Sequence, residues 1–167
     1  MGGGDSCHIA AHGAERALEF AAFRWPASGF PAAQWPLAAG GATRDASGRA
    51  LLLHFAPGRW LAPGPAPELG ERLARAAHGG AGTLLDATGK WARMSITGPA
   101  AARLLASTID IHALLAGREC AAAMLFDCPA IVARSNQGFE AWLQASYVTD
   151  FLASTGRVGA ALNPRLR

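Results

Sequence analysis

Hydrophobic and polar residues follow their clearest order between residues 82 and 123. Residues 83–86 form a short apolar run that predicts a strand, and Thr88 and Gly89 predict a turn because glycine takes positive φ without steric cost. From residue 91 to 97 apolar and polar side chains alternate, with Met94 and Ile96 on the face that we expect to be buried. Pro99 suits the first turn of a helix, where its missing N–H costs nothing. The stretch therefore predicts a β, β, α unit whose helix folds back on the sheet.

The same patterns continue on both sides of this unit. Strands are predicted over residues 17–25, 50–55, 59–63, 120–126, 130–134 and 139–144, and the second and third of these form a hairpin around the Pro57-Gly58 turn. Helices are predicted from Pro67 to the glycines at 79 and 80, and from Ser146 to Gly156. Helices packed to one side of a mainly antiparallel sheet make this an α+β fold.

These elements predict a simple domain organisation. Residues 1–16 are rich in glycine, alanine and histidine without a sustained period, so we expect a flexible N-terminal lead. Residues 17–156 carry all the predicted elements and form a single domain, and residues 157–167 form a tail. A length of 167 residues with 51% hydrophobic and 16% charged residues is enough for one domain with a sizeable core.

Composition then excludes several classes of function. The formal net charge is only +3 and the 15 basic residues are spread along the chain, so no concentrated basic surface for nucleic acid is predicted. No apolar run approaches the roughly 20 residues that span a bilayer, and no secretory signal pattern is visible, so we expect a cytoplasmic protein without membrane contact. Cys7, Cys120 and Cys128 have no CxxC spacing and are predicted to be buried free thiols.

Candidate chemistry is sparse. No GxSxG nucleophile elbow occurs, and Asp86, Asp110 and His112 form the only suggestive polar group. They could supply an acid and a base near one end of a sheet. The alternative, which we prefer, is that the two aspartates bond turn and loop N–H groups as Asx turns do. We therefore predict no catalytic, cofactor-binding or metal site in this chain.

Aromatic and charged side chains instead suggest contacts with other chains. An irregular proline-containing arm over residues 25–36 carries three aromatic side chains that cap the domain's own core or pack on another subunit. Arg93 lies on the polar face of its strand and is expected to pair with a carboxylate, either of this chain or of another subunit. The candidate interface residues are Trp25, Phe30, Trp35, Trp60, Arg93 and His112.

Three pieces of sequence between residues 84 and 120 carry a family resemblance: LLDATGKWARMSITGPAAARLLA, IDIH and AGREC. In this order they resemble the gamma subunit of heterotetrameric sarcosine oxidase. The matching positions are Asp86, Thr88, Gly89, Arg93, Gly98, Pro99, Ala101, Leu104, Leu105, Asp110, Ile111, His112 and Gly117. RWLAPG at residues 59–64 and FEAWLQASYVTDFLAST at residues 139–155 extend the resemblance over residues 51–155.

The resemblance implies a fold similar to part of the folate-binding aminomethyltransferase superfamily. It also implies a non-catalytic structural subunit beside alpha, beta and delta chains that hold FAD, FMN, NAD and tetrahydrofolate and oxidise sarcosine or a related N-methyl amino acid. A second hypothesis is a free-standing folate-binding, one-carbon protein of that superfamily. The chain has only about a third to a half of the usual length of such proteins, and its AGRECAA segment lacks the glutamine of their KGCYxGQ-like motif.

Overall fold

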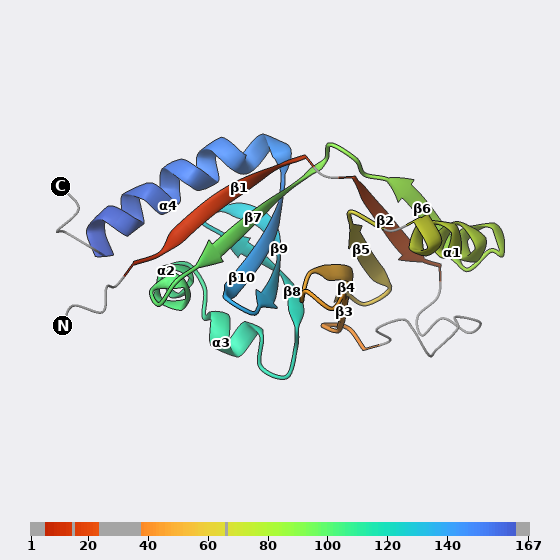
Figure 1. Ribbon diagram of the computed structural model, residues 1–167, viewed down its shortest axis with the longest axis horizontal. Coiled ribbons are helices and arrows are strands. Elements are labelled where there is room, and N and C mark those ends of the chain that lie inside the picture. Colours follow the sequence, from red (N-terminus) through yellow and green to blue (C-terminus); the bar gives the residue numbers. More distant parts are fainter. Residues whose placement is uncertain (1–5, 15, 24–37, 66, 163–167) are drawn as a thin grey trace.

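The computed structural model describes residues 6–14, 16–23, 38–65 and 67–162. Within these residues the strands form two five-stranded antiparallel sheets (Figure 1). In the order in which they pair, the strands of the first sheet are β1 (His8–Ala14), β7 (Trp91–Thr97), β10 (Gly138–Gln144), β9 (Cys128–Ser135) and β8 (Cys120–Leu125). Those of the second sheet are β3 (Ala42–Arg44), β4 (Ala50–Ala56), β5 (Arg59–Pro63), β2 (Ala17–Ala22) and β6 (Gly82–Asp86).

One face of the first sheet is covered by α2 (Ala101–Ala106), α3 (Ile111–Leu114) and α4 (Val148–Leu162), the last preceded by a 3-10 turn, η2 (Ala145–Tyr147). Met94 and Ile96 of β7 point into this core and are fully buried, which confirms the predicted strand register. Leu105 of α2 and Phe151 of α4 pack in the same cluster. Apolar burial of this kind is the main force holding helices on a sheet.

The second sheet has its own helix, α1 (Pro67–His78), on one face. Leu73 of α1 is fully buried against Phe20 and Trp60, and the predicted β4–β5 hairpin is present. The opposite faces of the two sheets meet in a third cluster, which includes Leu53, Leu61, Ile131 and Trp142. The chain is therefore built in four layers, in the order α1, second sheet, first sheet, and α2 with α3 and α4 (Figure 1).

The predicted α+β class with antiparallel pairing is confirmed, and four details of the prediction are wrong. The expected flexible lead contains β1, which pairs along the edge of β7 from His8 to Ala14. Its sequence has weak periodicity, but pairing satisfies its backbone groups, so tertiary context overrides local propensity. The last helix does not end at Gly156 but continues to Leu162, since a helical glycine costs only about 1 kcal/mol relative to alanine.

The third correction concerns β6 and β7, which lie in different sheets although they are consecutive in the chain. The turn between them is present, with Gly89 at φ +80° and the Lys90 amide donating to the Ala87 carbonyl at 3.0 Å. This turn carries the chain from the second sheet to the first, so β6 and β7 do not form a hairpin. The helix after β7 is also shorter than expected, since α2 begins at Ala101, two residues after Pro99.

Candidate functional site

A polar pocket lies on the face of the first sheet that points away from its helices, where the β3–β4 loop approaches the sheet. Its volume is about 410 Å³. The residues that line it are His12, Ser47, Gly48, Arg49, Arg93, Ser95, Thr97, Ser135, Asn136, Gln137 and Glu140. We call it the Glu140 pocket.

Strand register explains why these polar groups meet. On β7 the polar positions alternate with the core residues, and β1 and β10 flank this strand on its two sides. His12 of β1 pairs with Arg93, and Glu140 of β10 pairs with Ser95, so all four side chains project from the same face. On the other side of Glu140 the paired residue is Ala133, which packs against the second sheet. Glu140 thus lies on the border between the apolar contact and the polar pocket.

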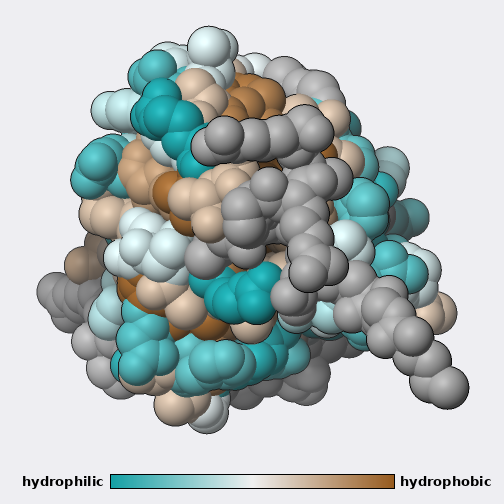
Figure 2. Space-filling view, turned by 90° about the vertical axis from the view of Figure 1, so that its left-hand side faces the viewer, coloured by the Kyte–Doolittle hydropathy of each residue, from teal (hydrophilic) through white to brown (hydrophobic). Residues whose placement is uncertain are grey.

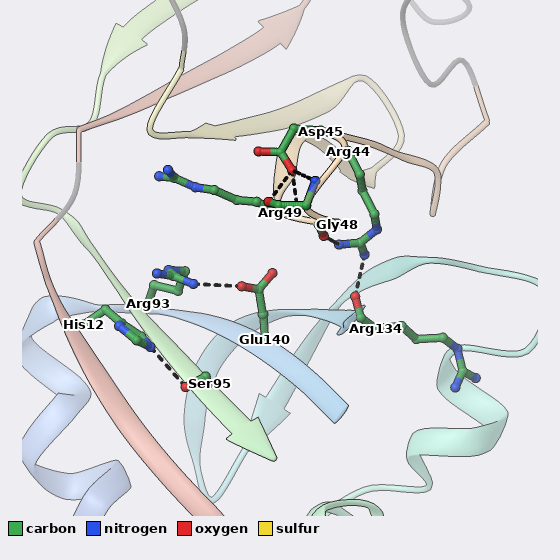
Figure 3. Close-up of polar contacts among 10 residues, drawn as sticks. His12, Arg44, Asp45, Gly48, Arg49, Arg93, Ser95, Arg134 and Glu140 are labelled. Atoms are coloured by element: carbon green, nitrogen blue, oxygen red, sulfur yellow. Dashed lines mark hydrogen bonds and ion pairs between the residues drawn. The ribbon is translucent and has the colours of Figure 1, made fainter. Parts of the chain in front are cut away.

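The pocket floor is held by two side-chain contacts (Figure 3). Arg93 Nη1 donates to Glu140 Oε1 at 2.9 Å, and His12 Nε2 lies 3.0 Å from Ser95 Oγ. Glu140 is only 7% exposed, and its second oxygen, Oε2, has no hydrogen-bond partner among the described residues. A buried acceptor left unpaired costs about 1–3 kcal/mol, and more when it is charged. Glu140 Oε2 is therefore available to accept a hydrogen bond from a bound group.

The β3–β4 loop forms the opposite wall and is internally bonded. Asp45 Oδ1 accepts from the Ser47 hydroxyl at 2.6 Å, the Ser47 amide at 2.8 Å and the Arg49 amide at 3.0 Å, and these bonds, the Ser47 side chain first, lower the pKa of the Asp45 carboxyl. Gly48 has φ +85°, and a Cβ there would lie 2.5 Å from Asn136 Nδ2. Glycine is thus favoured by the backbone conformation, and a Cβ there would also require the Asn136 side chain to move.

Arg44 ties this loop to the first sheet. Its Nη1 donates to the Gly48 carbonyl at 2.9 Å, and its Nη2 donates to the Arg134 carbonyl (Figure 3). The loop wall is therefore held on the first sheet by Arg44, which does not line the pocket.

Chemically, the Glu140 pocket is equipped for binding. It combines two guanidinium groups, one carboxylate, several hydroxyls and side-chain amides. Ser95 and His12 have the spacing of a nucleophile and a base, but His12 has no carboxylate partner among the described residues, which a serine triad requires. The described part of the chain also holds no group of three or more side chains placed to bind a metal ion.

The other predicted polar residues have local roles. Asp86 Oδ1 accepts from the Thr88 amide at 2.9 Å, and Asp110 caps α3 by accepting from the Ala113 amide at 3.0 Å, as the preferred alternative predicted. Bonds from Thr88 lower the pKa of the Asp86 carboxyl. The structure does not bring Asp86 together with His112, because β6 and α3 lie apart in the molecule (Figure 1).

The candidate interface residues fall into different places. Arg93 lies in the Glu140 pocket and pairs with a carboxylate of this chain. The prediction that Trp60 lies in a subunit interface is wrong. The Trp60 side chain is 1% exposed and stacks on His54 with ring centroids 4.3 Å apart, so it belongs to the chain's own core. His112 is exposed on α3. Trp25, Phe30 and Trp35 lie outside the described residues.

The cysteine prediction is confirmed for two of the three thiols. Cys120 and Cys128 are buried and free, whereas Cys7 is free and half-buried. Burial raises the pKa of Cys120 to about 12, with a smaller contribution from the charge of Glu119. Such a thiol is inert as a nucleophile at neutral pH.

Of the residues that line the pocket, only Arg93 was a candidate from the sequence, and those that sequence reasoning missed include Glu140, His12, Ser95 and Arg49. One signal was available for the first of them. Glu140 lies between Phe139 and Ala141 in a strand with apolar residues on both of its faces. A charged residue in such a strand is rarely buried without a partner. The partner itself could not be identified without the pairing of β7 with β10.

Exposed large apolar side chains are scattered over the described surface. They are Phe23, Leu85, Met124 and Leu152, which lie after β2, on β6, on β8 and on α4. On the side of the molecule that Figure 2 shows, the brown areas are separated by teal and pale residues. No helix in the described part of the chain is long and apolar enough to cross a membrane.

Comparison with known proteins finds similarity among solved structures. No protein-family model matches the sequence, and no curated protein matches it. Among solved structures, a chain of the heterotetrameric sarcosine oxidase from Corynebacterium sp. U-96, determined in complex with pyrrole 2-carboxylate, superposes with a TM-score of 0.69. The match covers 89% of this chain and 81% of that chain, at 22% sequence identity. The chain therefore has the fold of a chain of heterotetrameric sarcosine oxidase.

Proposed function

We propose that this chain is a non-catalytic structural subunit, of the gamma type, in a heterotetrameric sarcosine oxidase or a related N-methyl amino acid oxidoreductase complex. The observation that carries the proposal is the structural match, because it covers most of both chains. The gamma assignment rests on the sequence pieces between residues 84 and 120.

On this proposal the redox and one-carbon chemistry belongs to the partner chains. Alpha, beta and delta subunits hold FAD, FMN, NAD and tetrahydrofolate in the cytoplasm, and this chain supports their assembly. The local roles of Asp86 and Asp110 fit the proposal, since each carboxylate stabilises a turn or a helix end.

Assembly tests the proposal directly. The tagged chain is co-expressed with alpha, beta and delta chains of a heterotetrameric sarcosine oxidase, and the product is analysed by affinity capture and size-exclusion chromatography with flavin absorbance. We expect all four chains to elute together with bound flavin, and an unrelated flavoprotein to be absent from the captured material. Elution of the tagged chain as a lone monomer in the presence of the partners would refute the proposal.

A matched pair of variants locates the interface. His112 is exposed on α3 and is a candidate contact, whereas His78 is exposed at the end of α1 on the opposite side of the four layers. We expect His112→Ala to lower the yield of the assembled complex and His78→Ala to leave it unchanged. Equal yields from both variants would remove α3 from the interface.

The free-standing folate-binding hypothesis is the weaker one. A folate site needs aromatic or apolar walls as well as a carboxylate for the pterin edge. Among the described residues that line the Glu140 pocket there is no Phe, Tyr or Trp. We expect no tetrahydrofolate binding by the isolated chain up to about 1 mM, a limit of about 4 kcal/mol in binding free energy. Saturable quenching of tryptophan fluorescence at micromolar tetrahydrofolate would reverse the preference.

A further inference from the structure

We propose that the Glu140 pocket binds a compact, neutral polyol, with one ligand hydroxyl donating a hydrogen bond to Glu140 Oε2. The other ligand hydroxyls bond to uncharged polar side chains of the lining. All the residues that line the pocket belong to this chain. The site therefore does not depend on the proposed structural role, and it adds a ligand to a chain for which we propose no catalytic step.

The Glu140 carboxylate defines what the ligand has to supply. Oε1 accepts from Arg93 Nη1 at 2.9 Å, whereas Oε2 has no hydrogen-bond partner among the described residues. Glu140 is only 7% exposed, and Figure 3 shows its side chain projecting from β10 toward the loop that carries Gly48 and Arg49, the other wall of the pocket. An unpaired buried acceptor is unfavourable. The pocket therefore favours a ligand that brings a hydrogen-bond donor to Oε2.

The neighbouring charges favour a neutral donor. A cationic ligand group on Oε2 would share one carboxylate with the Arg93 guanidinium, and two like charges at such a short separation repel each other. Arg49 adds a second positive group to the lining. A ligand hydroxyl donates to Oε2 without adding a charge, and its bond is stronger than one between two neutral groups because the acceptor is ionised.

The two arginines of the lining give no reason to expect an anionic ligand. The Arg93 guanidinium is bonded to Glu140, and Arg49 interacts with the charge of Asp45. Both arginines also have further interactions. Neither guanidinium is therefore assigned a ligand group.

The rest of the lining suits a polyol. Thr97 of β7, Ser135 at the end of β9, and Asn136 and Gln137 of the turn after it supply hydroxyl and amide groups, which both donate and accept hydrogen bonds. No Val, Leu, Ile, Met, Phe, Tyr or Trp is among the residues that line the pocket. Its volume of about 410 Å³ lies near the lower end of the range for small-molecule sites, about 300–1,000 Å³. A compact molecule with several hydroxyls fits this lining better than a large apolar one.

The test uses the full chain and three probes that share one carbon skeleton. Glycerol has a hydroxyl on its central carbon, serinol has an ammonium group there, and 1,3-propanediol has only hydrogen. Each probe is titrated into isotopically labelled protein, and the NMR chemical shifts of the backbone amides are followed. We expect glycerol to give saturable shifts at Gly48 and Thr97 with a Kd of about 10 mM or tighter. Serinol and 1,3-propanediol should each bind at least about fivefold more weakly, a difference of about 1 kcal/mol.

Variants tie the binding to the pocket. Glu140→Gln keeps the shape of the side chain but removes its charge, and should weaken glycerol binding at least about fivefold. Thr97→Val removes one hydroxyl at nearly constant shape and should weaken it at least about threefold. Thr83→Val is the matched control, because Thr83 is exposed on β6 of the second sheet and does not line the pocket. Circular dichroism of each variant establishes that it is folded, and Thr97→Val still tests the site if Glu140→Gln does not fold.

Three results would overturn the site. The first is the absence of saturable shifts at pocket residues up to about 100 mM glycerol, ten times the expected Kd. The second is binding of serinol or 1,3-propanediol as tight as that of glycerol, because the ligand class would then be wrong. The third is unchanged glycerol affinity in the folded pocket variants. None of these results affects the co-expression experiment, and failure of assembly leaves the titration intact, so the two proposals fail separately.

Discussion

The two faces of the first sheet come from the same strands and differ sharply in character. On the helix side, Met94 and Ile96 of β7 and their neighbours form one continuous apolar core. On the other side, the face changes from an apolar contact with the second sheet at Ile131 to the polar pocket around Glu140. The first face is mainly apolar because helices cover most of it, with Ala11 of β1 left exposed at its edge. The second is divided because the second sheet covers only part of it.

This difference shows what strand alternation does and does not specify. A period of two separates the faces and identifies the one that is buried under helices. It does not reveal that a charged residue such as Glu140 is buried on the other face, because that burial depends on a second sheet and a loop from distant parts of the sequence. Substitutions on the two faces should therefore change the free energy of unfolding by different amounts.

The largest expected effect is on the apolar face. Ile96 is fully buried, so Ile96→Ala should lower the free energy of unfolding by about 2–5 kcal/mol through lost burial and an internal cavity. Chemical denaturation followed by circular dichroism measures this change. The control is Thr97→Ala, the next residue on the opposite face, which should cost less than about 1 kcal/mol. A change below about 0.5 kcal/mol for Ile96→Ala would contradict the register of β7.

The next effect is on the polar face. Arg93→Met should lower the free energy of unfolding by about 1–3 kcal/mol, because it removes the cationic partner that the buried Glu140 carboxylate has in Arg93. The double variant Arg93→Met with Glu140→Met should cost less than the sum of the two single variants. A double-mutant cycle by urea denaturation measures this coupling. Strict additivity would show that the ion pair contributes nothing to folding.

A smaller effect, visible only at alkaline pH, comes from the border between the two sheets. The pKa of Cys120 is raised from its ordinary value of 9.0 to about 12 in the folded chain. Between these values the unfolded chain releases the proton and the folded chain retains it, so stability is fully present below pH 9 and falls as pH rises toward 12. The slope reaches at most about 1.4 kcal/mol per pH unit.

Cys120→Ala separates this thiol from other groups that titrate at high pH. Stability measured by denaturation between pH 8 and pH 10.5 should fall less steeply in the variant than in the natural chain, since only the natural chain carries the buried thiol. Identical pH profiles would mean that Cys120 titrates normally and is open to solvent.

The smallest effect is at the edge of the helix-covered face. Asp110→Ala should lower the free energy of unfolding by about 1 kcal/mol, because the carboxylate caps the first turn of α3. Asp110→Asn should retain most of that stability, since the amide oxygen also accepts the Ala113 hydrogen bond. Thermal denaturation distinguishes the two variants. Equal melting temperatures for the alanine variant and the natural chain would mean that the Asp110 cap does not stabilise α3.

The local structure of this protein follows from contacts between neighbours in the sequence. The alternation over residues 91–97, the amphipathic stripe that became α1 and the Pro57-Gly58 turn between β4 and β5 each depend on neighbours in the chain, and each was predicted. The roles of Asp86 and Asp110 were predictable for the same reason, because Asx and capping bonds join residues two or three positions apart.

The pairing of the strands and the contacts of the second face of the first sheet depend on long-range contacts and appear only in the tertiary structure. β1 was missed because its stability comes from pairing with β7, some 80 residues away, and β6 and β7 were placed together although they lie in separate sheets. The Glu140 pocket joins β1, β7, β10 and the β3–β4 loop. The periodicity of a strand indicates which way each side chain points. Strands pair through backbone hydrogen bonds, which are the same for every residue type, so the sequence of a strand does not identify its partner strand.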